Sequence, residues 1–303
     1  MILVAGGQLD VNIGTFLRRL LRRRLDFVDL LVGPELHPVI AYDLRTNTLQ
    51  LNGRALQPRA SFIRHDVFLQ QKTSDRNAAP SALNWFYALK GWELGNPGVA
   101  AFNRQSASRE NAKVYNLLMA RQLGLRIPET LVTNDFAEVD RMLSGPLIQK
   151  PVAGGEFTTT FESFLEDLKD NSALGRYPRF IQPRLSRPEL RIYRIGESTL
   201  SFSLSSDDVD YREHQQVSLA RVPTPDSIAE KLVVLCDAIE LDFAAADFMR
   251  DDATGEWCFL EVNSQPMFAA FDDVCDGQLC DAMIDHLLKA MDQDAPLTPN
   301  STP

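Results

Sequence analysis

The side chains best suited to chemistry lie in one stretch, residues 244–263 (AAADFMRDDATGEWCFLEVN). It has the pattern of two short apolar strands joined by a polar turn, with Asp247 on the first strand and Glu261 and Asn263 on the second. Because side chains alternate along a strand, Glu261 and Asn263 share one face and Val262 turns into the core. Antiparallel pairing would bring Asp247 opposite them. Two carboxylates and an amide oxygen on one face predict a site for a hard cation such as Mg²⁺, of the kind it shares with nucleotide phosphates.

A second segment begins at the end of another apolar strand. Lys150 closes that strand, and residues 151–160 (PVAGGEFTTT) are rich in glycine and threonine, with Gly154 next to Gly155. A turn of this kind directly after a lysine can present backbone N–H groups and hydroxyls to phosphate oxygens. A plain hairpin turn has the same composition, so the segment alone leaves both interpretations open.

The composition limits the classes of function. The 303 residues are 45% hydrophobic and 24% charged, which is typical of a globular protein, and the net charge of −10 argues against a nucleic-acid partner. No apolar run reaches the roughly 20 residues of a membrane span, and the start, MILVAGGQLD, predicts a buried strand and not a signal peptide. The four cysteines form no CxxC pair and lie among apolar residues, so we expect reduced thiols in a cytoplasmic protein.

Local signals place several residues on regular elements. The pair Asn52-Gly53 predicts a tight hairpin turn of type I′. A helix that ends at Gly124 would carry Lys113 in its first turns. The first helix of the chain carries five arginines within residues 18–24. We interpret them as a solvated face, with docking of an acidic partner as the alternative.

The polar residues that stand out recur in a recognisable order: Lys113, Lys150 with its glycine-rich loop, Glu189, Arg191, Arg212, Asp247, Glu261 and Asn263. This order and spacing resembles the ATP-grasp superfamily over about residues 100–290. The most specific segments are AKVYNLLMARQLGLRIPETLVT, FIQPRLSRPELRIYRIG and CFLEVN. The segment around Glu189 and Arg191 resembles the "DiR" element of RimK-like members, with glutamate in place of the usual aspartate.

Within this superfamily the chain is most similar to the graspetide (microviridin-type) peptide ligases. The segment SFIRHD and the Trp-rich helix that follows resemble the "WyRr" strand and the pre-ATP-grasp region of that group, and residues 205–212 (SSDDVDYR) resemble its "DWR" element. The chain departs from the group in two places. Its metal strand continues as Asn263-Ser264-Gln265-Pro266 instead of Asn-Pro-x-Gly, and Pro183 stands in the hinge where an acid is common.

The resemblance implies an α/β (α+β) protein with the ATP-grasp fold in three parts. These parts are an N-terminal pre-ATP-grasp domain (residues 1–102), a central lid domain (103–185) and a C-terminal metal-binding domain (186–292), and a flexible tail (293–303) follows them.

It also implies ATP and one or two Mg²⁺ ions as cofactors, with Mn²⁺ as a compatible substitute. Lys113 and Lys150 would hold phosphate oxygens, Arg191 would steady the transferred phosphoryl group, and Arg212 would place the substrate carboxylate. The other expected site residues are the phosphate-covering Gly154 and Gly155, the adenine-binding Gln182, Pro183 and Leu185, the ribose-binding Glu189, and the metal ligands Asp247, Glu261 and Asn263.

The implied activity is an ATP-dependent carboxylate–amine or carboxylate–alcohol ligase that acts through an acyl phosphate and releases ADP and phosphate. Such chemistry depends on positioning and charge neutralisation, which suits a site rich in cations and metal ligands. The expected substrate is a ribosomal precursor peptide or another carboxylate, joined through ester or amide bonds on acidic side chains; a homodimer is compatible with the sequence. The alternatives are a RimK-like ligase for amino acids or small metabolites and a non-catalytic ATP-binding module.

Overall fold

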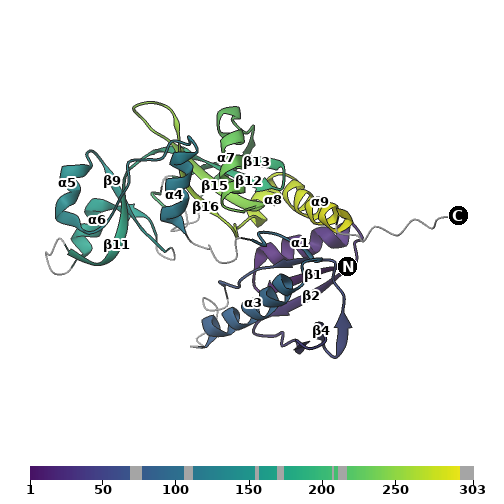
Figure 1. The fold of residues 1–303 in the computed structure, drawn as a ribbon. Coiled ribbons are helices and arrows are strands. Elements are labelled where there is room, and N and C mark those ends of the chain that lie inside the picture. Colours follow the sequence, from purple (N-terminus) through teal and green to yellow (C-terminus); the bar gives the residue numbers. More distant parts are fainter. Residues whose placement is uncertain are drawn as a thin grey trace. The chain divides into compact units, whose positions relative to one another are not determined.

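The computed structural model describes residues 1–68, 77–105, 112–153, 157–168, 174–206, 208–210 and 217–293 of the chain (Figure 1). Its internal contacts form two compact units, Met1–Arg104 with Met267–Pro303, and Gln105–Pro266. The sequence-based division into three parts stays a prediction. Apart from Gln293, the expected flexible tail lies outside the described residues.

The first unit is built on a parallel sheet with the strand order β2-β1-β6-β7. Its strands are β1 (Ile2–Gly7), β2 (Phe27–Val32), β6 (Ala60–Ile63) and β7 (Ala100–Ala101). The run Ile2–Ala5 of the central strand is almost fully buried on both of its faces. A continuous apolar run is what a parallel strand requires when helices or a second sheet cover both sides.

One face of this sheet packs against α3 (Ala78–Gly95) and a small antiparallel sheet, and the other carries α1 (Val11–Arg22). The small sheet consists of β3 (Ile40–Asp43), β4 (Thr48–Leu51) and β5 (Arg54–Leu56). On the α1 side, the rings of Phe16 and Phe62 lie 4.6 Å apart between centroids. Helix α9 (Gln278–Gln293) contacts α1, β6 and β7, so the last helix of the chain completes the first unit.

The turn between β4 and β5 confirms the predicted hairpin. Asn52 has φ of +49° and Gly53 has φ of +76°, so both central residues occupy the left-handed region that a type I′ turn requires. An asparagine followed by a glycine is the pair that adopts this backbone at the lowest cost.

Two of the arginines in α1 have structural partners. Arg19 forms an ion pair with Asp281 of α9, and Arg23 donates to Asp285 of the same helix at 2.6 Å. They therefore join α1 to α9, whereas Arg18, Arg22 and Arg24 are exposed. The interpretation as a solvated face holds for these three only.

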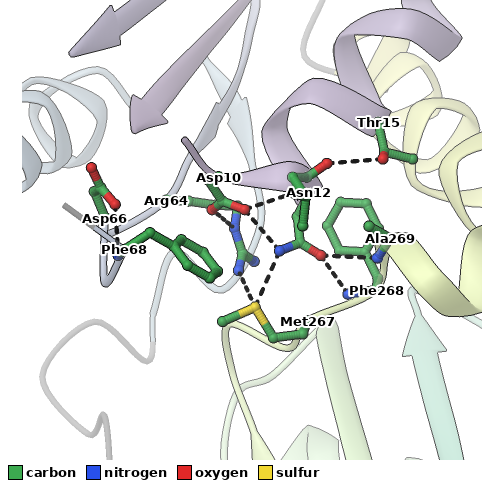
Figure 2. A network of polar contacts seen from close by, with 10 residues as sticks. Asp10, Asn12, Thr15, Arg64, Asp66, Phe68, Met267, Phe268 and Ala269 are labelled. Atoms are coloured by element: carbon green, nitrogen blue, oxygen red, sulfur yellow. Dashed lines mark hydrogen bonds and ion pairs between the residues drawn. The ribbon is translucent and has the colours of Figure 1, made fainter. Parts of the chain in front are cut away.

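A buried polar network connects the start of α1 to the segment that precedes α8 (Ala269–Val274) (Figure 2). Asn12, only 1% exposed, accepts the backbone N–H groups of Phe268 and Ala269 at 2.7 and 2.9 Å. Its amide nitrogen donates to Asp10 at 2.7 Å and to the sulfur of Met267 at 3.1 Å. Asp10 in turn caps α1 by accepting from Asn12 N–H, and it accepts from Arg64 Nε at 2.9 Å.

The larger sheet of the second unit is antiparallel, with the order β14-β13-β12-β15-β16. Its strands are β12 (Ser186–Ile195), β13 (Ser198–Ser205), β14 (Ser218–Val222), β15 (Phe243–Arg250) and β16 (Trp257–Asn263). Helices α4 (Lys113–Gln122) and α7 (Asp226–Ala238) pack against one face of it (Figure 1). The core between them contains Leu117, Leu190, Ile192, Leu232, Ala246, Phe248 and Val262.

A smaller sheet of the same unit has the order β10-β9-β11-β8. It consists of β8 (Leu131–Asp135), β9 (Leu147–Pro151), β10 (Thr159–Thr160) and β11 (Leu174–Pro183), with η1 (Phe136–Glu138), α5 (Val139–Met142) and α6 (Phe161–Asp167) beside it. Ile181 of β11 belongs to the core of this layer, while its neighbour Phe180 belongs to the core of the larger sheet. Because neighbouring strand residues face opposite ways, β11 contributes to both cores.

The elements that were not anticipated from the sequence include β14 and α8. The residues of β14 are exposed or half-buried in no regular alternation, so this edge strand lacks the alternating apolar pattern that identifies a strand in a sequence. Helix α8 has six residues, which is too short for a helical period to show.

The four cysteines are free and buried thiols, and burial raises the pKa of Cys236 to about 12. Across the described ranges, no helix has both the length and the apolar composition that crossing a bilayer requires.

We expect Asn12→Ala to lower the free energy of unfolding by about 2–4 kcal/mol, because the buried N–H of Phe268 and the partly buried N–H of Ala269 lose their acceptor. Urea denaturation followed by circular dichroism measures this change. Thr15→Ala removes an exposed hydroxyl that donates to the Val11 carbonyl, and we expect it to be close to wild type. Equal stability of the two variants would show that Asn12 does not hold the segment before α8.

Candidate active site

The two strands singled out in the sequence pair as expected. In the antiparallel register of β15 and β16, Asp247 lies directly opposite Glu261, and Asn263 lies opposite Ala245. Asn263 donates from its amide nitrogen to Glu261 Oε1 at 3.2 Å, while Val262 is buried in the core. The three predicted metal ligands therefore lie together where β15 pairs with the end of β16. They are on the face of the sheet opposite to the apolar core that α4 covers.

Asp247 is held by an arginine from the next strand. Arg191 of β12 lies opposite it in register and donates from Nε to Oδ1 at 2.6 Å and from Nη2 to Oδ2 at 2.8 Å. Asp247 is only 4% exposed, and a buried carboxylate needs such a paired, hydrogen-bonded cation. Arg191, for which the sequence predicted a role toward a phosphoryl group, thus neutralises a predicted metal ligand in this structure.

Glu261 is paired with the first residue of α4. Lys113 Nζ donates to Glu261 Oε2 at 2.8 Å. Burial alone would raise the pKa of Glu261, but the charges of Lys113 and Lys150 and the Lys113 hydrogen bond bring it down to about 2. The carboxylate is therefore ionised throughout the physiological range.

Lys150 reaches the same cluster from β9 of the smaller sheet. It lies opposite Phe180 in the register of β9 and β11, and its Nζ is 5.6 Å from the centre of that ring. Burial lowers the pKa of Lys150, whereas the negative charge of Glu261 raises it. The lysine thus projects from the smaller sheet toward the acids of the larger one.

A third carboxylate completes the cluster. Glu189 of β12 is 8% exposed, and its Oε1 lies 3.9 Å from Arg191 Nη2. Burial, followed by the negative charge of Asp247, raises the pKa of Glu189 to about 7, although Arg191 and Arg187 act in the opposite direction. Glu189, Asp247 and Glu261 are therefore close enough to influence one another.

The described residues contain no group of three or more histidine, cysteine, aspartate or glutamate side chains arranged to hold a metal ion. The set formed by Asp247, Glu261 and Asn263 contributes two carboxylates and one amide, and so has a different composition from such a group.

The segment expected to receive adenine runs from the end of β11 to the start of β12. Gln182 is 1% exposed, and its Nε2 donates to Thr130 Oγ1 at 2.8 Å. Its Oε1 is buried, with no hydrogen-bond partner in the described part of the chain. Pro183 ends β11, and Leu185 lies between the two strands. An unsatisfied buried acceptor is unusual enough to indicate a ligand surface.

Three predicted site residues, Gly154, Gly155 and Arg212, lie outside the described residues. The described residues that flank them are joined, because Thr158 N–H donates to Asp210 Oδ2 at 3.0 Å. Asp210 was not singled out in the sequence, although it lies within the SSDDVDYR segment. Its burial, with 6% exposed, is the signal that only the folded chain provides.

We expect Arg191→Met to lower the free energy of unfolding by about 3–5 kcal/mol, because it leaves the Asp247 carboxylate buried without a counter-ion. Adding Asp247→Leu should recover most of the loss, because a buried ion pair can often be replaced by apolar residues. Urea titrations of the single and double variants measure this coupling.

The matched control is Arg126→Met, which breaks exposed ion pairs to Asp251 and Glu256 and should cost less than about 1 kcal/mol. A double variant that is less stable than Arg191→Met would contradict the pairing.

Comparison with known proteins rests on structure alone, since no protein-family model and no curated protein matches the sequence. The ATP-grasp ligase PsnB, complexed with a phosphomimetic variant of its minimal precursor, Mg and ADP, is 22% identical; 94% of this chain and 98% of that chain superpose with a TM-score of 0.76. The macrocyclase MdnC from Microcystis aeruginosa MRC, bound with precursor peptide MdnA, is 18% identical over 95% and 99%, with a TM-score of 0.74. VanG D-Ala:D-Ser ligase from Enterococcus faecalis is 15% identical over 96% and 98%, with a TM-score of 0.65. The expected fold is thereby confirmed: the chain has the fold of the ATP-grasp ligases.

Proposed function

We propose that the protein is an ATP-dependent ligase that activates carboxylates and joins them to an amine or a hydroxyl, with release of ADP and phosphate. The observation that carries this proposal is the charge cluster of the second unit. Two buried carboxylates, Asp247 and Glu189, and the half-buried Glu261 meet side chains of the opposite sign from three different elements, namely α4, β9 and β12. In the ATP-grasp fold, such a cluster suits a nucleotide whose phosphates carry a metal ion.

The residues present fit Mg²⁺. Asp247 and Glu261 lie opposite each other on neighbouring strands, and Asn263 adds an amide oxygen two residues further on. Carboxylate and amide oxygens are the donors that Mg²⁺ prefers, and the ion usually binds few protein ligands because it keeps several waters and substrate phosphates. We propose that these three residues bind one or two Mg²⁺ ions, with Mn²⁺ as a substitute.

The residues also fit ATP. Lys113 and Lys150 place two ammonium groups beside Glu261, and both would hold phosphate oxygens. The buried Oε1 of Gln182 can accept from the exocyclic amine of adenine, with the backbone of Pro183 and Leu185 nearby. Glu189 would accept from ribose hydroxyls. Gly154 and Gly155 are proposed to cover the phosphates.

When bound, ATP with Mg²⁺ would supply the phosphoryl group that turns a substrate carboxylate into an acyl phosphate with release of ADP. The amine or hydroxyl would then attack the acyl carbon, and phosphate would leave. The chain's own part is to bind, orient and neutralise. Arg191 holds Asp247 in this structure, and in a complex in which Asp247 bound a metal ion its guanidinium would donate to phosphoryl oxygens instead. Arg212 is proposed to place the substrate carboxylate, since an arginine fork matches that group.

For the substrate we propose a ribosomal precursor peptide whose acidic side chains are closed into ester or amide rings. This is supported by the fold shared with PsnB and MdnC, both solved with precursor peptides. The same fold in a D-Ala:D-Ser ligase keeps a small-molecule substrate as the alternative outcome of the test below. We further propose a cytoplasmic location and that a homodimer is compatible with the activity.

Incubation of a candidate precursor peptide with the protein, ATP and Mg²⁺ should lower the peptide mass by about 18 Da per bond, one water for each condensation. Mass spectrometry of the peptide, with ADP assayed in parallel, measures this. Glu261→Ala should abolish both changes, because it removes a metal ligand and the partner of Lys113. Glu256→Ala, on the exposed turn before β16, is the matched control and should retain both.

A gain in mass equal to an amino acid less one water would favour the RimK-like alternative. If the protein binds ATP but forms no ADP with any carboxylate, the result would favour the alternative of a non-catalytic ATP-binding module.

We expect Gln182→Leu to weaken ADP binding on the order of tenfold, because adenine loses the acceptor for its amine. Binding of GDP should change little, since guanine presents an acceptor at the equivalent ring position. Calorimetric titrations of ADP and GDP in the presence of Mg²⁺ measure the ratio. Gln122→Leu, on the exposed end of α4, is the control. An unchanged ADP-to-GDP preference would remove Gln182 from the adenine site.

A further inference from the structure

A second buried polar group without a partner lies on the segment between β11 and the core of β12. Arg187, the second residue of β12, donates from Nη2 to the Val209 carbonyl at 3.1 Å. Its Nη1 is buried, and none of the described residues accepts a hydrogen bond from it. A guanidinium nitrogen carries two N–H donors, and leaving buried donors unsatisfied costs more than most hydrogen bonds gain.

The position of Arg187 narrows what could satisfy it. It lies two residues before Glu189 and four before Arg191 on one strand, and its positive charge lowers the pKa of Glu189. Arg187 therefore lies near Glu189, on the same strand.

The anchoring of Arg187 also restricts its movement. The Val209 carbonyl that holds Nη2 is adjacent to Asp210, and Asp210 holds the Thr158 N–H. One nitrogen of the fork is thus held by the carbonyl next to the buried Asp210, while the donors of the other meet no acceptor among the described residues.

The two unsatisfied groups of this segment are complementary in kind. Gln182 offers a buried acceptor and Arg187 a buried donor, five positions further along the chain. Adenosine presents the matching pair, since its base carries an amine donor and its ribose carries hydroxyl oxygens that accept. Glu189 lies between Arg187 and Arg191 on the strand. While it is ionised, its carboxylate accepts hydrogen bonds and cannot donate them. A ribose hydroxyl that donates to Glu189 therefore still has oxygen lone pairs that can accept from another donor.

We propose that Arg187 is a specificity-determining residue that donates from Nη1 to a ribose hydroxyl oxygen of the bound nucleotide, opposite the acceptor Glu189. The proposal rests on the proposed function, because it takes the segment from β11 to β12 as the nucleoside site. It assigns to Arg187 the discrimination between ribonucleotides and deoxynucleotides.

The test is binding of ADP, 2′-deoxyADP and 3′-deoxyADP to the full-length protein with Mg²⁺, measured by calorimetry for wild type and Arg187→Gln. We expect Arg187→Gln to weaken ADP on the order of tenfold, as for a lost hydrogen bond from a charged donor, and to weaken one deoxy analogue less than about twofold. Arg184→Gln changes an exposed arginine of the same segment and should behave as wild type.

Two results would overturn the proposal. Equal weakening of ADP and both analogues would mean that Arg187 acts on a phosphate or on the fold. Unchanged ADP binding would mean that its partner belongs to another substrate. Should Arg187→Gln not fold, Arg187→Lys keeps the charge without the fork and gives the same comparison. Failure of wild type to bind any of the three nucleotides would instead defeat the proposed function itself.

Discussion

The second unit is organised around the cost of burying negative charge. Asp247, Glu189 and Glu261 lie on neighbouring strands of one sheet, where removal from water disfavours each carboxylate and each disfavours the others. Such a group is tolerated only when cations reach it, and these come from three different elements. The sheet supplies Arg191, the first turn of α4 supplies Lys113, and the smaller sheet supplies Lys150. The packing of α4 and of the smaller sheet against the larger one is thus also a requirement of electrostatics.

This arrangement links stability to ligand binding. In the described structure, the acids proposed to bind metal are held by the cations proposed to bind phosphate. Under the proposed function, binding of a metal–nucleotide complex would be an exchange of partners: the carboxylates would bind the metal, and the ammonium and guanidinium groups would bind phosphate oxygens. The net gain would be smaller than the new contacts suggest, because existing charge-assisted hydrogen bonds would be lost. Removal of one cation affects both states, so nucleotide affinities of such variants are informative only beside their unfolding free energies.

The sequence was informative where the physics is local. Asp247, Glu261 and Asn263 could be placed on one face because alternation along a strand and a short polar turn need only neighbouring residues. The turn at Asn52-Gly53 was predictable for the same reason. By contrast, the pairing of Arg191 with Asp247 depends on the register of strands that are 56 residues apart in the chain. Long-range register of this kind is set by packing, and spacing does not encode it.

The first unit offers a second long-range example, because it combines residues 1–104 with residues from 267 onward.

Asn12 is an ordinary polar residue near a helix start until Phe268 and Ala269 present their N–H groups to it from 256 and 257 residues away. No residue near Asn12 in the sequence indicates that these two backbone groups are its partners. Gln182 and Arg187 show the converse case, since each lies in a segment expected to contact a nucleotide, yet only the folded structure reveals which of their polar atoms lack a partner. Buried polar atoms are almost always satisfied in folded proteins, so two exceptions within six residues are better explained by a common ligand than by two independent defects. A segment that leaves one acceptor and one donor unsatisfied is less stable alone than a fully paired one, and the ligand that completes both recovers that free energy on binding.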